Sequence, residues 1–283
     1  MFNSKYRKES IDRLKSSIEK FNETNKTVIE ASETLFKRRT SLKSTLEEVE
    51  EYVNLLSNTP KKIVTDVEKI KIKLDNYQKI LNVVEEEIKK ATVSSSTSAA
   101  ASVVAGVGVA AFAPTAAMGI ATTFGVASTG TAISALSGAA ASNAALAWLG
   151  GGALVAGGGG VAAGETLLTL AGPVGWIIGG AGLVGSGLIV NGKNKKIAAE
   201  ANEKNEKVIA QTKVQMALVK DIENICLITD KNIRILSDYI SRVRKDFPYD
   251  YLQMTVDQKK VLGVMVNTSL AASKSLHSTV GAN

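Results

Sequence analysis

Hydrophobic residues between positions 11 and 56 recur at the alternating three- and four-residue spacing of an amphipathic helix. One set lies at seven-residue intervals and is apolar throughout: Leu14, Phe21, Val28, Leu35, Leu42, Val49 and Leu56. A second set is polar only in its middle: Ile11, Ile18, Asn25, Ser32, Arg39, Leu46 and Val53. No proline or glycine interrupts residues 1–59. The pattern predicts one helix of roughly 50 residues with a coiled-coil seam.

A second long helix is expected directly after this one. Thr59 suits an N-cap and Pro60 a first helical residue. The apolar positions then alternate by four and three at Ile63, Val67, Ile70, Leu74, Tyr77, Leu81, Val84 and Ile88. Because only about three residues join the two helices, we expect them to be antiparallel neighbours.

The C-terminal part repeats the helical pattern after Lys193. A glycine-free run reaches Asp246 and carries the heptad Ile222, Cys226, Thr229, Ile233, Leu236, Ile240 and Val243. Phe247 and Pro248 predict its end, and residues 255–258 indicate a capping box that opens a last helix. The fold class expected is all-α: an elongated bundle of long antiparallel coiled-coil helices with a large Gly/Ala-rich hydrophobic helical hairpin region.

Charge and glycine are segregated along the chain. Residues 91–192 contain one charged residue, Glu165, and 22 of the 24 glycines. Residues 1–90 carry 19 basic and 16 acidic residues, and residues 193–283 carry 15 and 10. This distribution excludes an ordinary mixed α/β enzyme core. We expect an N-terminal helical hairpin over 1–92, a hydrophobic membrane-active region over 93–192, and a long plus a short helix over 193–283.

The hydrophobic region divides into three segments of unequal strength. Segment 166–190 holds 12 strongly apolar residues, whereas 99–125 and 131–164 hold 8 each. At about −0.4 kcal/mol per strongly apolar residue, inserting segment 166–190 into a membrane gains about 5 kcal/mol. Each of the other two segments gains about 3 kcal/mol. Such marginal values are compatible with packing in a soluble bundle in one state and insertion into a membrane in another.

Small residues in this region form faces on which helices can approach closely. The repeat Gly152, Ala156, Gly160 and Gly164 has a four-residue spacing, and Gly175 with Gly179 forms a second pair. In lipid such faces drive helix association. A tightly packed helix inside a soluble bundle uses the same face, so both interpretations stay open.

The flanks of the region indicate its topology. Positive charge precedes it at Lys89 and Lys90 and follows it at Lys193, Lys195 and Lys196. This predicts both arms on the cytoplasmic side and an even number of crossings. Trp148 and Trp176 are candidate headgroup anchors or core residues. Glu165 would lie at a hairpin tip or interface, line a pore, or be a buried neutral acid.

The sequence offers little chemistry for catalysis. Its one cysteine, Cys226, and one histidine, His277, exclude a His/Cys metal cluster. Cys226 lies in an apolar stripe and is expected to be a small buried hydrophobe; His277 is expected in a solvated tail. Residues 157–160 are not followed by Lys-Ser/Thr, so they form no P-loop. We expect a protein that is not an enzyme, with no catalytic residues, metal, cofactor or small-molecule substrate.

The net charge of +7 arises on helices where bases and acids interleave, and aromatic residues make up only 5%. We therefore expect no nucleic-acid partner; the mild basic bias suits an anionic membrane surface. The polar N-terminus predicts no Sec signal peptide. The protein is expected to be made in the cytoplasm and to act at a membrane, either the producer's inner membrane or that of a target cell.

Long amphipathic helices flanking a glycine- and alanine-rich hydrophobic stretch resemble the α-helical pore-forming toxins of the cytolysin A and haemolysin BL type. The resemblance implies a soluble helical bundle that inserts into a lipid membrane as a homo-oligomer, or as a hetero-oligomer with related helical components. Residues 128–164 are also similar to a glycine-rich stretch of uncharacterised bacterial membrane-associated proteins, and loosely to the hydrophobic hairpins of apolipoprotein L and the interferon-inducible small proteins. The hydrophobic region is about twice what one hairpin needs, at about 20 residues per span.

Two functions follow as expectations. The first is a membrane-active pore-forming protein, either a bacterial toxin component or a cell-suicide effector against phage. The second is a constitutive membrane-anchored coiled-coil scaffold or adaptor without pore activity. Partition between soluble and membrane fractions discriminates them, because the scaffold is always membrane-bound.

Overall fold

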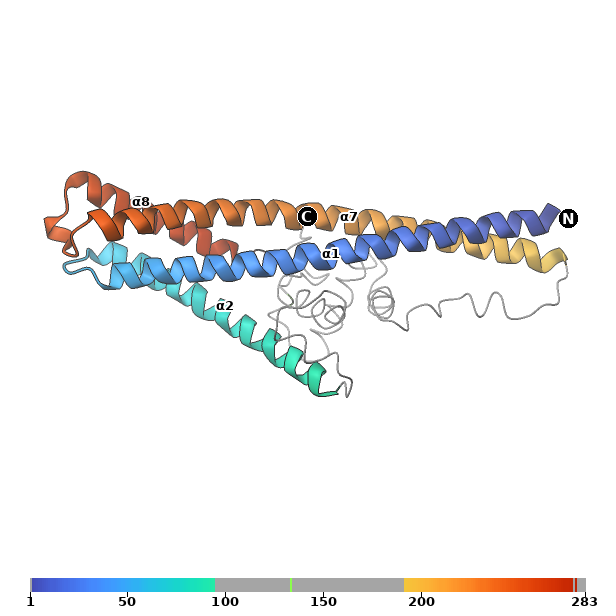
Figure 1. Cartoon of the computed structure of the whole chain (residues 1–283), viewed down its shortest axis with the longest axis horizontal. Helices are drawn as coiled ribbons and strands as arrows, with labels where there is room; N and C mark the ends of the chain where they lie inside the picture. The colour runs from blue at the N-terminus through green and yellow to red at the C-terminus, as the bar shows by residue number, and fades with distance from the viewer. Residues whose placement is uncertain (1, 95–132, 134–190, 277, 279–283) are drawn as a thin grey trace. The chain divides into compact units, whose positions relative to one another are not determined.

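The computed structural model describes residues 2–94, 133, 191–276 and 278, and within them the fold is helical (Figure 1). The elements are α1 (Phe2–Asn54), α2 (Lys61–Ser94), α7 (Asn191–Asp246), the short 3₁₀ helix η4 (Tyr251–Gln253) and α8 (Val256–Ser275). These described residues contain no strand, only an isolated parallel bridge between Ser57 and Asp250. The expectation of an all-α fold with long helices is confirmed.

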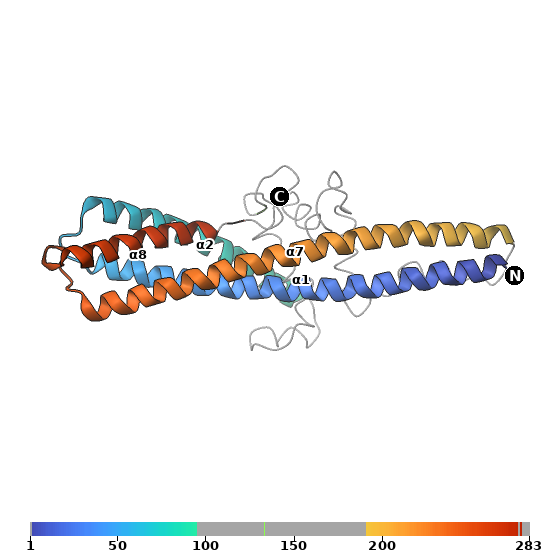
Figure 2. The ribbon, with the colours of Figure 1, turned by 90° about the horizontal axis from the view of Figure 1, so that it is seen from above.

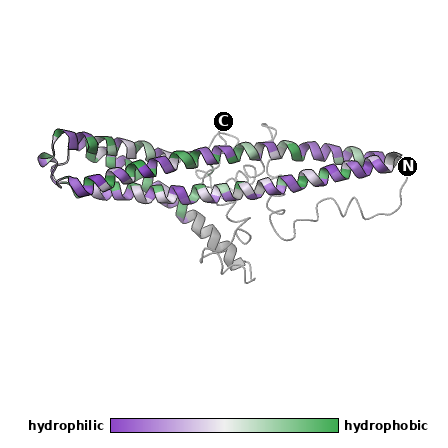
Figure 3. Ribbon diagram, turned by 45° about the horizontal axis from the view of Figure 1, so that its top comes forward, coloured by the Kyte–Doolittle hydropathy of each residue, from purple (hydrophilic) through white to green (hydrophobic). Residues whose placement is uncertain are grey.

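The two longest helices are as long as the uninterrupted heptad patterns predict. α1 has 53 residues and α7 has 56. Polar and apolar residues alternate along both (Figure 3). α7 ends at Asp246, directly before Phe247 and Pro248, because the residue before a proline is disfavoured in helical conformation.

The chain forms two compact units, and both long helices contribute to each. The first unit comprises Met1–Ser32, Lys90–Asp221 and Val280–Asn283. The second unit comprises Glu33–Lys89 and Ile222–Thr279. Each is described by itself below.

Within each unit α1 and α7 run parallel, which corrects the expectation that all long helices are antiparallel. In the first unit Arg7 contacts Asn194, 187 residues away, and in the second Tyr52 contacts Val243, 191 residues away. A near-constant separation of contacting residues requires parallel helices. The short-loop argument holds only for sequence neighbours such as α1 and α2, whose ion pair Lys71–Glu50 fits an antiparallel hairpin. Residues 55–190 give the chain enough length to return before α7 begins.

The core of the second unit is dense and apolar. One cluster draws on α1, α2, α7, α8 and the connections between them: Val49, Tyr52, Val53, Leu56, Val67, Ile240, Val243, Phe247, Met254, Leu262, Met265 and Val266. The Tyr52 hydroxyl donates to the carbonyl oxygen of Val243 at 3.3 Å, which satisfies the polar group of this buried ring. All seven positions of the apolar heptad set that begins at Leu14 are buried. The heptad pattern therefore identified the inward face of α1.

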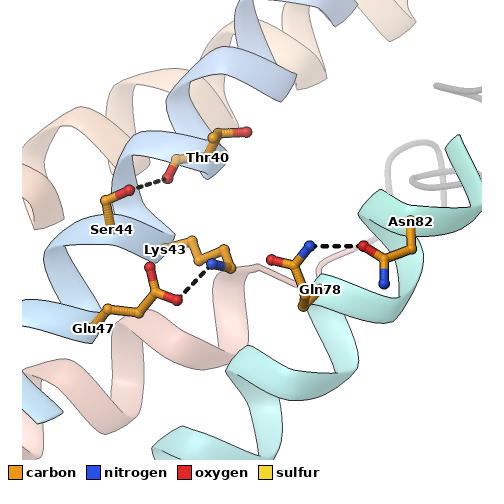
Figure 4. A network of polar contacts seen from close by, with 6 residues as sticks. All are labelled: Thr40, Lys43, Ser44, Glu47, Gln78 and Asn82. Atoms are coloured by element: carbon orange, nitrogen blue, oxygen red, sulfur yellow. Dashed lines mark hydrogen bonds and ion pairs between the residues drawn. The ribbon is translucent and has the colours of Figure 1, made fainter. Parts of the chain in front are cut away.

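Several polar contacts of α1 and α2 stay within their own helices (Figure 4). They are i,i+4 contacts between Thr40 and Ser44, Lys43 and Glu47, and Gln78 and Asn82. The side-chain pairs Lys43–Glu47 and Gln78–Asn82 contribute about 0.2–0.5 kcal/mol each. The association of α1 with α2 in this unit therefore depends mainly on the buried seam residues Ile70, Leu74 and Tyr77.

The predicted helix boundaries are confirmed at α8 and shifted at α2. The Thr255 hydroxyl accepts from the Gln258 N–H, and the Gln258 side chain accepts from the Thr255 N–H, which is the expected capping box. At α2 the Thr59 hydroxyl instead donates to the carbonyl of Leu56, and the helix begins at Lys61. Asn58, with φ of 58°, makes the left-handed turn before it.

Candidate functional site: the polar seam of the long helices

Most of the residues that the sequence singled out lie outside the described residues. These are the small-residue positions, the tryptophans and the lone acid of the hydrophobic region: Gly152, Ala156, Gly160, Gly164, Gly175, Gly179, Trp148, Trp176 and Glu165. His277 lies outside as well. Of the helices that the structure does describe, none has an apolar run long enough to traverse a bilayer.

The predicted basic flank lies at the beginning of α7. Lys193 is in the first turn, and Lys195 and Lys196 follow with exposed side chains. The first turn contains no acidic residue. Positive charge near a helix N-terminus is unfavourable by the helix dipole, by about 0.3–1 kcal/mol per residue. Helix stability therefore does not explain this cluster.

In the first unit, α1 and α7 meet through a polar seam. Arg7 Nη1 donates to Asn194 Oδ1 at 3.1 Å, and Asn202 Nδ2 donates to the Tyr6 hydroxyl at 3.0 Å. The buried residues of this part include Ser10, Thr24, Ser32, Asn194, Ala198, Ala201, Thr212 and Gln215. The same unit also buries Leu14, Phe21, Val28, Leu218 and Val219, so small and polar side chains, which bury little apolar area, make up only part of its interior.

Five buried polar atoms of the described part of this unit have no hydrogen-bond partner: Arg7 Nε, Asn22 Oδ1, Ser32 Oγ, Asn205 Oδ1 and Gln215 Oε1. Each such atom costs about 1–3 kcal/mol relative to a satisfied one. The polar seam, meaning the buried polar residues that α1 and α7 contribute to the first unit, is therefore weakly held.

The second unit contains one buried charge among its described residues, Arg39. Its side chain is 1% exposed, and its Nη2 donates to the carbonyl oxygen of Ser278 at 2.6 Å, just beyond the end of α8. Burial lowers the pKa of Arg39 to about 10, although Tyr77 and Cys226 oppose the shift. Burial also raises the pKa of Tyr77 to about 12, against the opposing influence of Arg39 and Thr40. The arrangement lets a cation cap the C-terminal end of α8 inside the bundle.

Cys226 is half-buried in the second unit. Burial, and secondarily the charge of Asp230, raise the pKa of its thiol. A raised pKa lowers the thiolate fraction, so the thiol is a poor nucleophile. Within the residues that the structure describes, no group of three His, Cys, Asp or Glu side chains is placed to hold a metal ion.

The polar positions of α7 were not singled out from the sequence, although a signal for them exists. Continuing the heptad of Val243 and Leu236 toward the N-terminus reaches Thr229, Ile222, Gln215, Val208, Ala201 and Asn194. All but Val208 of these six are buried. The inward face thus continues to the beginning of α7, while its residues change from apolar to polar and small. Because the change removes the hydrophobic signal, periodicity alone misses it.

Comparison with known proteins finds no match to any protein-family model, any curated protein or any solved structure.

Replacing Gln215 by leucine is expected to stabilise the first unit by about 1–3 kcal/mol, because it removes a buried amide oxygen without a partner. Hydrogen exchange of α7 amides in residues 198–219 measures the change as slower local opening. Lys213→Leu, at an exposed position two residues away, is the control and should change stability by less than about 0.5 kcal/mol. Faster exchange in Gln215→Leu would contradict a weakly held polar seam.

Proposed function

We propose that this chain is a membrane-active pore-forming protein that changes from a soluble helical bundle to a membrane-inserted oligomer. The observation that carries the proposal is the segregation of charge along the chain. Residues 91–192 contain only one charged residue and 22 of the 24 glycines. A stretch of this length and composition is suited to lipid, and its small-residue repeats are suited to helix association there.

The described helices support a switch. α2 leads into the hydrophobic region and α7 leads out of it, so movement of either helix changes the position of the region. The polar seam in the first unit lowers the free energy that opening requires. A ligand shifts an equilibrium by its difference in affinity for the two states. A trigger therefore has to bind the open form more tightly only by the free energy that separates the closed form from the open one, and the polar seam keeps this free energy small.

The proposed mechanism has three steps. First, contact with a membrane or partner opens α1 from α7 in the first unit, while the apolar core of the second unit stays folded. Second, residues 99–190 enter the bilayer as hairpins, with Lys195 and Lys196 held at the headgroups. Third, the faces around Gly160 and Gly179 associate between or within copies and form the pore.

The mechanism also assigns a place to Glu165. A charge facing lipid at the bilayer centre costs about 2.5–3.5 kcal/mol on insertion scales. In an oligomer it would instead lie at a hairpin tip or line the aqueous pore. The proposal covers two bacterial roles, a toxin component and a cell-suicide effector against phage. Both would act by depolarising a membrane.

The test is dye leakage from anionic liposomes with the full chain, comparing wild type with Gly160→Leu and Gly179→Leu. The variants should still pellet with liposomes but release dye at least about tenfold more slowly, because leucine prevents close backbone approach. Val161→Leu and Val184→Leu raise apolarity without changing a small-residue position, and they should leak like wild type.

The possible results separate the proposal from its alternative. Equal leakage from all variants argues against assembly through small residues. Protein that is membrane-bound in every fraction and condition, with no leakage, supports the scaffold function instead. Failure of wild type to bind or permeabilise any liposome, with or without partner proteins, overturns the proposed function.

A further inference from the structure

The second unit ends in two connections that are joined to each other. One links α1 to α2 and the other links α7 to α8, and they lie side by side (Figures 1 and 2). The Ser57 N–H donates to the Tyr249 carbonyl at 2.8 Å, and the Tyr251 N–H donates to the Ser57 carbonyl at 3.0 Å. We call residues 55–62 and 242–260 the bundle tip.

Side chains fix the backbone of the bundle tip further. Asp250 Oδ1 accepts from Asn58 Nδ2 and from the Leu252 N–H, each at 3.0 Å. The ring of Tyr249 lies 5.7 Å from that of buried Tyr52, in a tilted arrangement. These contacts give the bundle tip a defined conformation, so the side chains that it presents to solvent are preorganised.

The bundle tip presents large apolar side chains to water. Leu252 and Val256 are each 69% exposed, Leu55 is 58% exposed and Tyr249 is 48% exposed. These are four of the twelve exposed large hydrophobic residues in the part of the chain that the structure describes. Leu55, Tyr249 and Leu252 lie on the two connections, and Val256 is the first residue of α8.

Basic residues outnumber acidic ones in the bundle tip, although Arg244 pairs with Glu51, just outside it, and Lys260 pairs with Asp257. The bundle tip contains seven basic and three acidic residues, a net charge of +4, whereas the whole chain has +7. Lys61, Lys62 and Lys245 are exposed. Lys259 lies over the ring of Tyr251 with its Nζ 5.0 Å from the ring centroid, which keeps cation and aromatic surface together.

We infer that the bundle tip is a docking surface for anionic lipid headgroups. Its exposed aliphatic side chains, tyrosines and lysines match the chemistry of a membrane interface, which takes apolar groups, amphipathic rings and positive charge at successive depths. The net charge complements the negative potential of anionic lipid.

A protein partner fits the same surface less well. Stable protein interfaces bury about 1,000 Å² or more around a core depleted of charged residues. The bundle tip has a net charge of +4, so a second copy docked on it would bring like charges together. A lipid surface needs no shape complementarity and gains from each lysine independently.

This inference does not require residues 95–190 to insert. It assigns the first contact with the membrane to a preformed part of the second unit, so it goes beyond the proposed pore and can hold or fail separately.

The test is co-sedimentation of the full chain with phosphatidylcholine vesicles, with and without phosphatidylglycerol. Lys61→Gln with Lys62→Gln should weaken binding to the anionic vesicles by about thirtyfold, the combined contribution of two lysines at such a surface. Leu252→Ser with Val256→Ser should weaken it by about tenfold. The matched controls are Lys213→Gln with Lys220→Gln, and Leu227→Ser with Ile228→Ser, all at exposed positions of α7. These should bind like wild type.

Dye leakage measured in parallel keeps the two proposals apart. Loss of binding in the bundle-tip variants alone supports the inference, even if wild type never releases dye, in which case only the pore fails. Unchanged binding of both bundle-tip variants overturns the inference, even if wild type leaks strongly. Equal binding to neutral vesicles, or self-association that depends on Leu252 and not on lipid, also overturns it.

Discussion

Replacing Leu262 by alanine is expected to lower the free energy of unfolding by about 2–5 kcal/mol. Leu262 is fully buried on α8 within the apolar core of the second unit, beside Met265 and Val266. Truncation removes apolar contacts and leaves a cavity that the three neighbouring helices fill only partly. Because α8 has only 20 residues, it has few other buried side chains with which to stay docked.

Chemical denaturation followed by circular dichroism measures this loss. Val264→Ala is the matched control, since Val264 lies two residues away on the same helix and is 48% exposed. It should change stability by less than about 0.5 kcal/mol. A loss for Leu262→Ala no larger than that of the control would contradict the packing of α8 into this core.

Replacing Arg39 by methionine is expected to raise the free energy of unfolding by about 1–4 kcal/mol, because a buried charge costs more in desolvation than apolar packing of similar volume. The guanidinium is almost fully buried. The carbonyl of Ser278, which loses its donor, belongs to an exposed residue and can bind water. The prediction runs opposite to the usual effect of a core substitution.

The pH dependence provides a second readout for Arg39. Its pKa is lower in the folded state, about 10, so between that pH and its ordinary value the unfolded chain binds more protons. The penalty for burying the guanidinium is therefore complete below about pH 10 and declines as pH rises further. The stability advantage of Arg39→Met over wild type should shrink between about pH 8 and about pH 11. An advantage that stays constant across this range, or a variant less stable than wild type at its lower end, would contradict desolvation as the main cause of the penalty.

The effects expected of Leu262→Ala, Arg39→Met and Gln215→Leu together imply that stability is unevenly distributed along the protein. The second unit contains the twelve-residue apolar core and one buried cation, whereas in the first unit unpaired polar atoms accompany buried apolar residues such as Leu14, Phe21 and Val28. Elements that move in a conformational change are drawn from the less stable parts of a structure. Under the proposed function, opening begins at the polar seam, and the second unit remains folded with its bundle tip at the membrane.

The sequence alone determined the helices, because their signals are local. Heptad spacing identified the buried face of α1, the Phe247–Pro248 pair ended α7, and Thr255 with Gln258 capped α8. Each of these depends on residues within one or two turns of one another. The nearly charge-free composition of residues 91–192 is likewise a property of the sequence, and the proposed function depends on it.

Only the tertiary structure decided how the helices pair and what their polar positions do. The parallel course of α1 and α7 depends on contacts almost two hundred residues apart, such as Arg7 with Asn194 at a separation of 187, which no local pattern encodes. The sequence placed Arg39 only among the polar members of the second heptad set, and its burial against Ser278 follows from where α8 ends. The bundle tip also arises from long-range pairing, since Leu55 and Leu252 belong to different connections that Ser57 and Tyr249 join. Pairing between distant segments is a property of the folded chain, because its free energy exists only when both segments are in place.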